Sequence, residues 1–426
     1  MSHAGRVQRR WLVMALIWTV FVIHGIDRSV VLVLLEPIRH EFGLNDSQVG
    51  LISGLAYAVP FALAGIPLGA LADRVRRTKL LAGLLALWSL FTALAGLSPT
   101  FPLLLLARAG VGASEAGAPP TMISIIGDTF DAKTRPAALS FYYTAPFVGL
   151  MLGATIAGQL SQSHGWRTAL LAVGIPGIVL AAIVAIVLRE PVRGATEDGE
   201  IEARAPVSIL AALRFIARET ELRRLITALV LTAFVSLAVS SWIPAFLQRI
   251  HGISPSRTGI MTALAVGLTG VLGSLAGGAI GARYGKGGID RLKRLCGSAI
   301  LLSVPLVIVA PQLGSPYLAL GFFAAWSFIG SAYLGPGWGI AIAATPPHMR
   351  STVMAVAIVL TNLVGAGLGP QSVGLLSDLL NWAGDPAHLQ HAMSSAAVMS
   401  VASAWLFLRS GRLASPPREL AGQFGG

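Results

Sequence analysis

The chain has 426 residues, of which 54% are hydrophobic and 12% are charged. Soluble domains carry roughly 25% charged residues, so this composition excludes an ordinary soluble protein. The net charge of +12 fits basic loops at a membrane surface, and no nucleic-acid partner is expected. The single cysteine, Cys296, allows no internal disulfide and no thiolate metal cluster, and we expect it to be an apolar core residue.

Apolar runs recur from one end of the chain to the other and predict an all-helical membrane protein with twelve membrane-spanning helices. Each run is near the ~20 residues that a bilayer requires, or somewhat longer. The first run is too long for a cleaved signal peptide, and no small-residue cleavage site follows it. The expected spans are 11–35, 49–71, 80–97, 101–126, 137–160, 169–188, 225–247, 258–282, 295–310, 317–343, 352–376 and 392–408.

The loop charges predict the orientation of these spans. With both termini in the cytoplasm, 25 of the 31 Lys and Arg residues lie in inner tails and loops, and 4 lie in outer loops. Such an excess of basic residues marks the cytoplasmic side. We therefore expect a multi-pass protein of the plasma (inner) membrane, in contact with membrane lipids and acting as a monomer.

A long connection, 189–224, divides the spans into six plus six. The predicted domains are an N-terminal six-helix bundle (1–188), a central cytoplasmic loop (189–224) and a C-terminal six-helix bundle (225–426). Transporters with two such bundles rock them about a central site. Glycines with equal spacing in the fifth and eleventh spans support the internal repeat, and we expect them to serve close helix packing. They are Gly149, Gly153 and Gly158, and Gly365, Gly369 and Gly374.

The second part of the central loop has an amphipathic pattern. Ile209, Leu213 and Ile216 share one face, and Arg214 and Arg218 lie on another. The pattern indicates a helix at the cytoplasmic membrane surface. A simple run-in to the seventh span is the alternative.

Three polar residues interrupt the first span: His24, Asp27 and Arg28. A charged residue at the middle of a membrane helix costs roughly 2.5–3.5 kcal/mol on insertion scales. Their i, i+3 and i+4 spacing places all three on one helical face. We expect this face to point at a wet, protein-lined interior that supplies partners.

The fourth span adds Arg108 and Glu115, seven residues apart on one face. Counting the helical rise places Asp27, Arg28 and Arg108 at similar depth, with Glu115 nearer the cytoplasm. An ion pair of Arg108 with Asp27 that only pins two helices is an alternative. Glu115 has no base one turn away, so we expect a buried acid without a fixed partner that loads and releases protons.

The loop between spans two and three carries a motif at 69–77, Gly-Ala-Leu-Ala-Asp-Arg-Val-Arg-Arg. It resembles the G-x-x-x-D-R/K-x-G-R/K-R/K signature of the major facilitator superfamily, and it falls where that family has it. Arg76 departs from the family, which usually has glycine there.

This motif predicts an inner gate made of Gly69, Asp73, Arg74 and Arg135. Asp73 can accept hydrogen bonds from a helix N-terminus or pair with Arg135, which would hold the gate shut in one state. The basic residues of this loop, Arg77 included, are also explained by topology alone. The equivalent loop after the eighth span lacks the acid, so a latch there must be weaker or built differently.

Motifs spread over nearly the whole chain are similar to those of the Spinster family within this superfamily. The resemblance implies proton-linked transport of amphipathic lipids, among them lysophospholipids and sphingoid-base phosphates. The motifs are Ile-Asp-Arg at 26–28, Glu-Pro-Ile at 36–38, Phe-Gly-Leu at 42–44, Arg108 with Glu-Ala at 115–116, Gly-Ile-Pro-Gly at 174–177, Arg-Glu-Pro at 189–191, 241–247, 334–336, 362–363 and 367–370.

The same resemblance implies that Asp27 and Glu115 carry proton coupling. Arg28 and Arg108 would then hold an anionic headgroup or neutralise the two acids between transport cycles. The residues expected to bind substrate are Arg28, Arg108, His24, Tyr57, Trp242 and Asn362. His24 relays protons or is a structural, hydrogen-bonded histidine.

Organic-anion symporters of hexuronate type share the Asp-Arg and Glu-Ala motifs and are the alternative. Their two arginines would clamp a small carboxylate. The central spans are poor in amides, which favours an amphipathic substrate. An enzyme is not expected, because no H-E-x-x-H or Gly-x-Ser-x-Gly motif occurs, and no cofactor or metal is expected. A channel is the remaining class.

Overall fold

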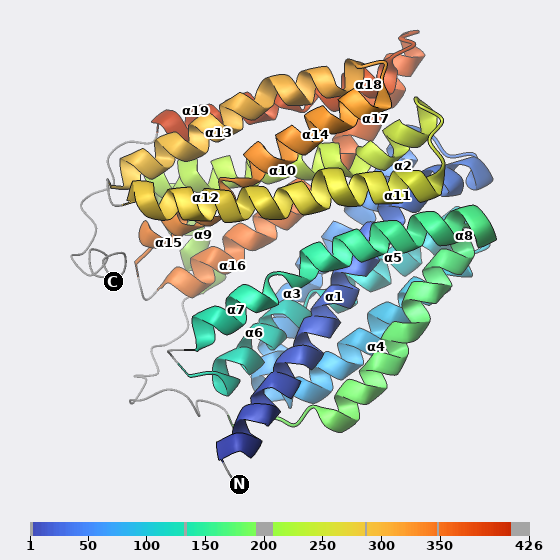
Figure 1. Ribbon diagram of the computed structural model, residues 1–426. Helices are drawn as coiled ribbons and strands as arrows, with labels where there is room; N and C mark the ends of the chain where they lie inside the picture. The colour runs from blue at the N-terminus through green and yellow to red at the C-terminus, as the bar shows by residue number, and fades with distance from the viewer. Residues whose placement is uncertain (1–2, 132–133, 193–207, 286–287, 347–348, 410–426) are drawn as a thin grey trace. The chain divides into compact units, whose positions relative to one another are not determined.

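The computed structural model describes residues 3–131, 134–192, 208–285, 288–346 and 349–409. These parts of the chain consist of helices joined by turns and short loops, without a β-strand (Figure 1). The sequence was expected to form an all-helical protein, and the described residues confirm it.

The α-helices range from 8 residues in α2 to 43 in α8, and several contain an internal proline. Gly165, with φ 82°, interrupts α8 and divides it into two helical halves. The helices are α1 (His3–Phe42), α2 (Asp46–Ser53), α3 (Leu55–Arg74), α4 (Arg77–Gly96), α5 (Phe101–Glu115), α6 (Ala118–Thr129), α7 (Arg135–Tyr142), α8 (Ala145–Val187), α9 (Ile209–Arg218), α10 (Thr220–Arg249), α11 (Pro255–Thr262), η1 (Ala263–Leu268), α12 (Thr269–Gly285), α13 (Ile289–Val309), η2 (Ala310–Gln312), α14 (Pro316–Ser331), α15 (Leu334–Ala343), α16 (Arg350–Leu360), η4 (Thr361–Leu368), α17 (Gly369–Trp382), α18 (His388–Ser395) and α19 (Ala397–Arg409).

Ten helical segments of the described chain are long and apolar enough to cross a membrane. One of them, Ala138–Val187, has 50 residues and bends at Gly165, so it accounts for both the fifth and the sixth expected span. The fourth expected span is divided into α5 and α6, each too short to count alone. All twelve expected spans therefore have a helical counterpart.

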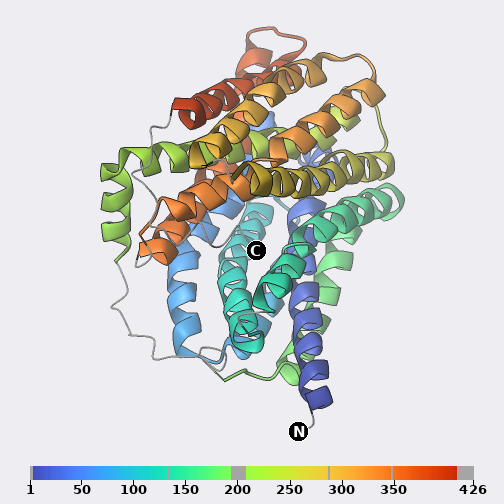
Figure 2. The ribbon, with the colours of Figure 1, turned by 60° about the vertical axis from the view of Figure 1, so that its left-hand side comes forward.

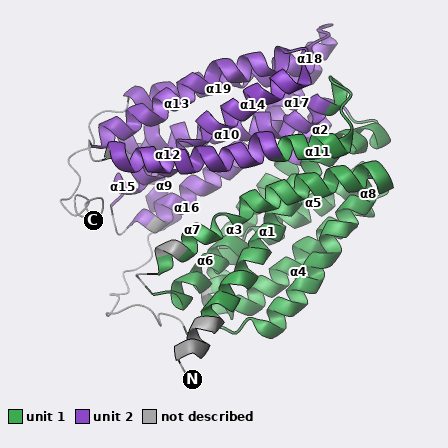
Figure 3. Cartoon of the chain, viewed as in Figure 1, with its two compact units in different colours: residues 1–44, 55–200, 248–263 green, residues 45–54, 201–247, 264–426 purple. Residues whose placement is uncertain are grey.

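The chain separates into two compact units (Figure 3). Unit 1 comprises Met1–Leu44, Leu55–Glu200 and Gln248–Ala263, and unit 2 comprises Asn45–Gly54, Ile201–Leu247 and Leu264–Gly426. The units share their main parts with the predicted bundles, whose boundaries stay a prediction. The units differ from the predicted bundles in two short segments, one containing α2 and the other α11. These two segments occupy equivalent places in the two sequence repeats.

In unit 1, α1 and the first half of α8 lie side by side (Figures 1 and 2). Glycines make this approach possible. A Cβ atom added at Gly25 would lie 2.8 Å from the Pro146 carbonyl oxygen, and one at Gly153 would overlap the Ser29 hydroxyl. Further along α8, Gly158 fits against the Pro255 carbonyl at the start of α11. The packing role expected for this glycine row is confirmed.

The glycine row in unit 2 has the same role. A Cβ atom at Gly369 would lie 2.8 Å from the Phe234 carbonyl oxygen of α10. Gly374 fits against the Asp46 carbonyl at the start of α2, as Gly158 fits against the start of α11. The equal spacing in the sequence therefore reflects equal helix contacts within each unit.

Candidate functional site

Four helices of unit 1 bring the interrupting charges of the sequence together. Helix α1 supplies His24, Asp27 and Arg28, and α5 supplies Arg108 and Glu115. Except for the half-buried Arg28, the members are buried. We call this group the central charge cluster: His24, Asp27, Arg28, Tyr57, Thr92, Arg108 and Glu115.

Asp27 is 1% exposed, and one of its two carboxylate oxygens has a partner. The Thr92 hydroxyl of α4 donates to Asp27 Oδ1 at 2.7 Å. Oδ2 accepts no hydrogen bond of standard geometry from the described residues, and the Trp88 indole of α4 is the donor nearest to forming one. Thr92 was missed from the sequence, because one hydroxyl in an apolar span carries no signal of the helix it faces.

Glu115 is fully buried, with one hydrogen-bond donor and one close imidazole nitrogen from two other helices. The Tyr57 hydroxyl of α3 donates to Glu115 Oε2 at 2.6 Å, and His24 Nε2 lies 3.3 Å from the same oxygen. The expectation that Glu115 lacks a fixed partner is therefore wrong, because spacing along one helix does not reveal neighbours on others. Its second oxygen, Oε1, has no hydrogen-bond partner within the described chain.

The two arginines of the cluster lie over the ring of Tyr57. The guanidinium carbon is 5.1 Å from the ring centroid for Arg28 and 5.5 Å for Arg108. This is the range of cation–π attraction. The ion pair of Arg108 with Asp27, which was the alternative interpretation, does not occur within 4.0 Å among the described residues. Helix α3 can come this close because Gly112 of α5 has no side chain to clash with the Tyr57 backbone.

The cluster therefore has unused capacity for both protons and anions. Asp27 and Glu115 each bury one oxygen without a donor, and Arg108 buries Nε without an acceptor. Native proteins satisfy nearly all buried polar atoms, so such atoms call for an explanation. A carboxyl group that gains a proton escapes the cost of burying a charge. A guanidinium group with an unused N–H donor can bind an anion.

The other two residues expected to bind substrate belong to unit 2. Trp242 is fully buried in α10, and its indole N–H donates to the Pro370 carbonyl at 3.0 Å. Asn362 lies in the π-helical η4 and donates through Nδ2 to the Ile358 carbonyl at 3.0 Å. Their substrate role stays a prediction.

The residues expected to form the inner gate lie around the end of α3 and the start of α7. Arg74 is exposed at the last position of α3. Arg135 donates to the carbonyls of Gly127 and Phe130 at the end of α6, at 3.0 and 3.3 Å. A Cβ atom at Gly69 would meet no neighbour. The side chain of Asp73 lies outside the described part, so its pairing with Arg135 stays a prediction.

Arg77, a basic residue of the same motif, has a specific structural role. In the sequence, membrane topology alone explains it. Arg77 is buried at the start of α4 and forms ion pairs with Asp128 at 2.5 Å and Glu190 at 2.8 Å. The Thr78 backbone N–H donates to the second oxygen of Glu190 at 2.9 Å. Burial acts to raise the pKa of Glu190, but the hydrogen bonds from Thr78 and Arg77 outweigh it and lower that pKa. The Arg-Glu-Pro motif at 189–191, after the sixth span, was the available signal.

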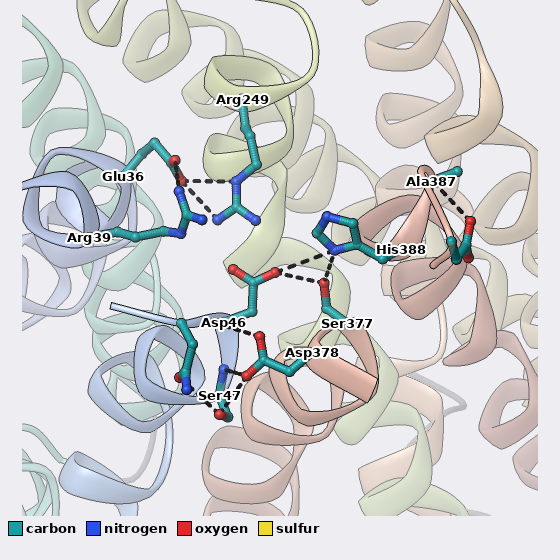
Figure 4. Close-up of polar contacts among 11 residues, drawn as sticks. Glu36, Arg39, Asp46, Ser47, Arg249, Ser377, Asp378, Ala387 and His388 are labelled. Atoms are coloured by element: carbon teal, nitrogen blue, oxygen red, sulfur yellow. Dashed lines mark hydrogen bonds and ion pairs between the residues drawn. The ribbon is translucent and has the colours of Figure 1, made fainter. Parts of the chain in front are cut away.

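A second polar group joins α2 to α17 and α18 in unit 2 (Figure 4). The Asp378 carboxylate caps the N-terminus of α2: it accepts from Asp46 N at 2.9 Å, Ser47 N at 2.8 Å and Ser47 Oγ at 2.6 Å. The Ser377 hydroxyl donates to Asp46 Oδ2 at 2.6 Å and lies 2.8 Å from His388 Nδ1. We call these five residues the α2 cap network. A carboxylate at a helix N-terminus is stabilised by the free N–H groups and the helix dipole.

Unit 1 contains two contacts of related design. Glu36 of α1 pairs with Arg249 at 3.0 Å and with Arg39 at 3.1 Å (Figure 4). At the start of α11, the Ser256 backbone N–H donates to the Gln162 side chain of α8 at 3.2 Å. Gln162 follows Gly158 by four residues, as Asp378 follows Gly374, so the two helix starts are capped from equivalent positions.

Comparison with known proteins identifies relatives that match most of the chain. The sequence model of the Major Facilitator Superfamily matches residues 17–370. An MFS-type efflux pump of Mycolicibacterium smegmatis is 30% identical over 89% of this chain and 87% of its own length. Protein spinster homolog 1 of Homo sapiens is 31% identical over 88% of this chain and 74% of its own length.

A solved structure extends this likeness to three dimensions. It is the crystal structure of a bacterial homolog to the human lysosomal transporter Spinster, in an inward-facing and unoccupied conformation. It superposes with a TM-score of 0.82 and 26% identity, over 94% of this chain and 97% of its own.

Proposed function

We propose, from the premise that this chain is a Spinster-like transporter of the major facilitator superfamily, that it couples protons to the movement of an amphipathic substrate. The chain belongs to this superfamily and has its fold of twelve membrane-spanning helices. It is a multi-pass secondary transporter and not an enzyme. The proposal concerns the substrate, the gradient that drives its transport and the residues that bind the substrate and the protons.

The observation that carries proton coupling is the pair of unpartnered oxygens, Asp27 Oδ2 and Glu115 Oε1. Both groups sit in one cluster, and Tyr57 and His24 link Glu115 to two other helices. Adding a proton to either acid changes the local charge by one and adds an O–H donor. That change alters the balance of attractions on Arg28 and Arg108, and it is the event that biases the alternating access.

The substrate is inferred from the same cluster. Arg28 and Arg108 each place a guanidinium group within about 6 Å of the Tyr57 ring, and two such groups suit a phosphate or carboxylate headgroup. The spans are rich in apolar residues and poor in amides, which suits a substrate with an acyl chain. We infer a lysophospholipid or a sphingoid phosphate as the substrate class, with His24, Tyr57, Trp242 and Asn362 contributing to its site.

The remaining assignments complete the proposal. Gly69, Asp73, Arg74 and Arg135 act at the inner gate. The protein works as a monomer in the plasma membrane. Both termini lie in the cytoplasm, which the excess of basic residues in the inner loops favours.

Proteoliposomes test this function directly. Uptake of a radiolabelled lysophosphatidylethanolamine is measured with and without a pH gradient for the wild type and for Glu115→Gln. We expect the gradient to accelerate wild-type uptake and to have no effect on the variant. Glu41→Gln is the matched control, because Glu41 also lies in a candidate span but pairs with Arg167 and Trp166 outside the cluster. Gradient-driven uptake by Glu115→Gln equal to that of the control would refute the coupling role.

A small organic anion of hexuronate type is the second candidate, favoured by the paired guanidinium groups alone. Uptake of labelled galacturonate, measured beside that of the labelled lysolipid, separates the two. Saturable uptake of galacturonate that excess lysolipid does not inhibit, together with no saturable uptake of the lysolipid, would transfer the assignment to the organic-anion class. Uptake that never saturates and ignores the gradient would indicate a channel.

A further inference from the structure

Helix α9 lies in unit 2 immediately before a candidate membrane span. Its N-terminus is capped by Ser208, whose hydroxyl accepts from Ala211 N at 3.2 Å. At its other end Arg223 donates to the Ala217 carbonyl. One residue separates α9 from α10, which is long and apolar enough to cross a membrane. The short connection fixes α9 close to the level at which α10 enters the bilayer.

One strip of α9 packs on the rest of unit 2. Ala212 and Ile216 are buried against Val353, Val356 and Ala357 of α16. Successive residues of a helix turn by about 100°, so this strip occupies about a third of the circumference. The remaining surface of α9 has to be explained by something else.

The exposed surface of α9 carries two further strips, one apolar and one cationic, which lie side by side. Ile209, Leu210 and Leu213 form an apolar strip and are 39%, 55% and 42% exposed. Arg214 and Arg218 form an exposed cationic strip next to it. Helix α9 itself contains no acidic residue, and Glu219 at its C-cap leaves the two arginines with a net positive charge.

An apolar strip beside a cationic strip matches the boundary between the acyl chains and the phosphates of a membrane leaflet. The neighbouring span places α9 at that boundary without further folding, which favours lipid over a protein partner. We propose that the exposed face of α9 binds a leaflet containing anionic phospholipids, with its apolar strip in the acyl region and Arg214 and Arg218 on the phosphates.

Through this contact, the lipid composition of the membrane can affect the helices that carry out transport. Helix α16, on which α9 packs, continues directly into the π-helical η4 that contains Asn362. A lipid-bound α9 restrains the start of α16 through Val353 and Val356. Anionic lipid therefore acts on the eleventh span from outside the central charge cluster.

Spin labels on the apolar strip test the proposal without any substrate. Leu213→Cys and, separately, Leu210→Cys are labelled in the full-length protein, whose native Cys296 is fully buried. The protein is reconstituted in phosphatidylcholine alone or mixed with phosphatidylglycerol. We expect the labels to be accessible to oxygen and protected from a water-soluble nickel complex, with stronger protection when phosphatidylglycerol is present.

Charge variants test the arginines. A basic residue near an anionic surface contributes roughly a fivefold change in partitioning, so Arg214→Gln with Arg218→Gln should lower the ratio of protected to exposed label roughly 25-fold. Arg291→Gln with Arg294→Gln is the matched control. Both arginines are exposed on α13, and replacing them removes as much charge as replacing Arg214 and Arg218. The control pair should leave the labels on α9 unchanged.

Either of two outcomes overturns the proposal. Labels at both positions that remain in water in every vesicle would leave the apolar strip to a protein partner. An equal response of the control pair would show that α9 has no specific part in binding anionic lipid. Neither outcome depends on the transported substrate, so this test can fail while the proposed transport function stands.

Discussion

The central charge cluster of unit 1 and the α2 cap network of unit 2 both bury aspartate or glutamate, but they use the carboxylates differently. Both oxygens of Asp378 accept hydrogen bonds from the start of α2. Asp27 and Glu115 each leave one oxygen without a donor. A fully bonded carboxylate holds helices in place, whereas a partly bonded one can change its protonation state without first breaking the structure.

The largest expected effect separates these two uses by function. Asp27→Asn should reduce gradient-driven uptake to that of empty vesicles, because an amide cannot carry the proton. The Thr92 hydroxyl can still donate to the amide oxygen, so the free energy of unfolding should stay unchanged or rise. Uptake assays and thermal unfolding of the purified variant measure both. If Asp27→Asn were destabilised and still used the proton gradient, Asp27 would be a structural carboxylate like Asp378.

Asp378→Asn should do the opposite and act on stability. The amide offers one acceptor where the carboxylate offered two, and the charge-assisted bonds that are lost contribute about 1.5–3 kcal/mol each at most. Thermal unfolding should show the loss, with a smaller change for Gln162→Ala at the equivalent, uncharged contact. Equal losses at the two sites would mean that the charge of Asp378 contributes nothing.

Gly374→Ala tests whether close approach, and not only charge, holds α2. The added Cβ would overlap the Asp46 carbonyl oxygen, which should destabilise the protein by about 1–2 kcal/mol. Gly278→Ala is the control, since nothing lies within 4 Å of a Cβ at that position. The two melting temperatures should differ by several degrees, and coincident values would show that α2 yields without cost.

The smallest effect concerns Glu190, a third carboxylate of the fully bonded kind. Its pKa is lowered in the folded protein, so its contribution to stability is present above its unfolded pKa and is lost as the pH falls through its folded pKa. Wild-type stability should therefore fall more between neutral and acidic pH than that of Glu190→Gln. Thermal unfolding across this range measures the difference, and parallel pH profiles would contradict it.

The sequence predicted the fold well because apolar runs and loop charges follow directly from the bilayer. It placed the end of the first span at 35, whereas α1 continues to Phe42. The last turns of α1 are polar and are held by Glu36 with Arg39 and Arg249, so no apolar signal marks them. Helix ends that depend on a partner from a distant segment are beyond the reach of periodicity.

The site was predicted in part for a similar reason. Charges inside an apolar run are visible in the sequence, so Asp27, Arg28, Arg108 and Glu115 were found. Their neutral partners were not, because nothing in an apolar span shows that the Thr92 hydroxyl meets Asp27. The burial of Arg77 was also hidden, because a basic residue in a basic loop looks like its neighbours until Asp128 and Glu190 are in place.

The cap on α2 has a further consequence for how that contact opens. Three hydrogen bonds converge on the single carboxylate of Asp378. Rotating the start of α2 misaligns its two backbone donors together, because they belong to consecutive residues of one helix start. We therefore expect these hydrogen bonds to be lost together rather than one at a time. A contact of this kind would respond to a gradual force on the helix in a single step.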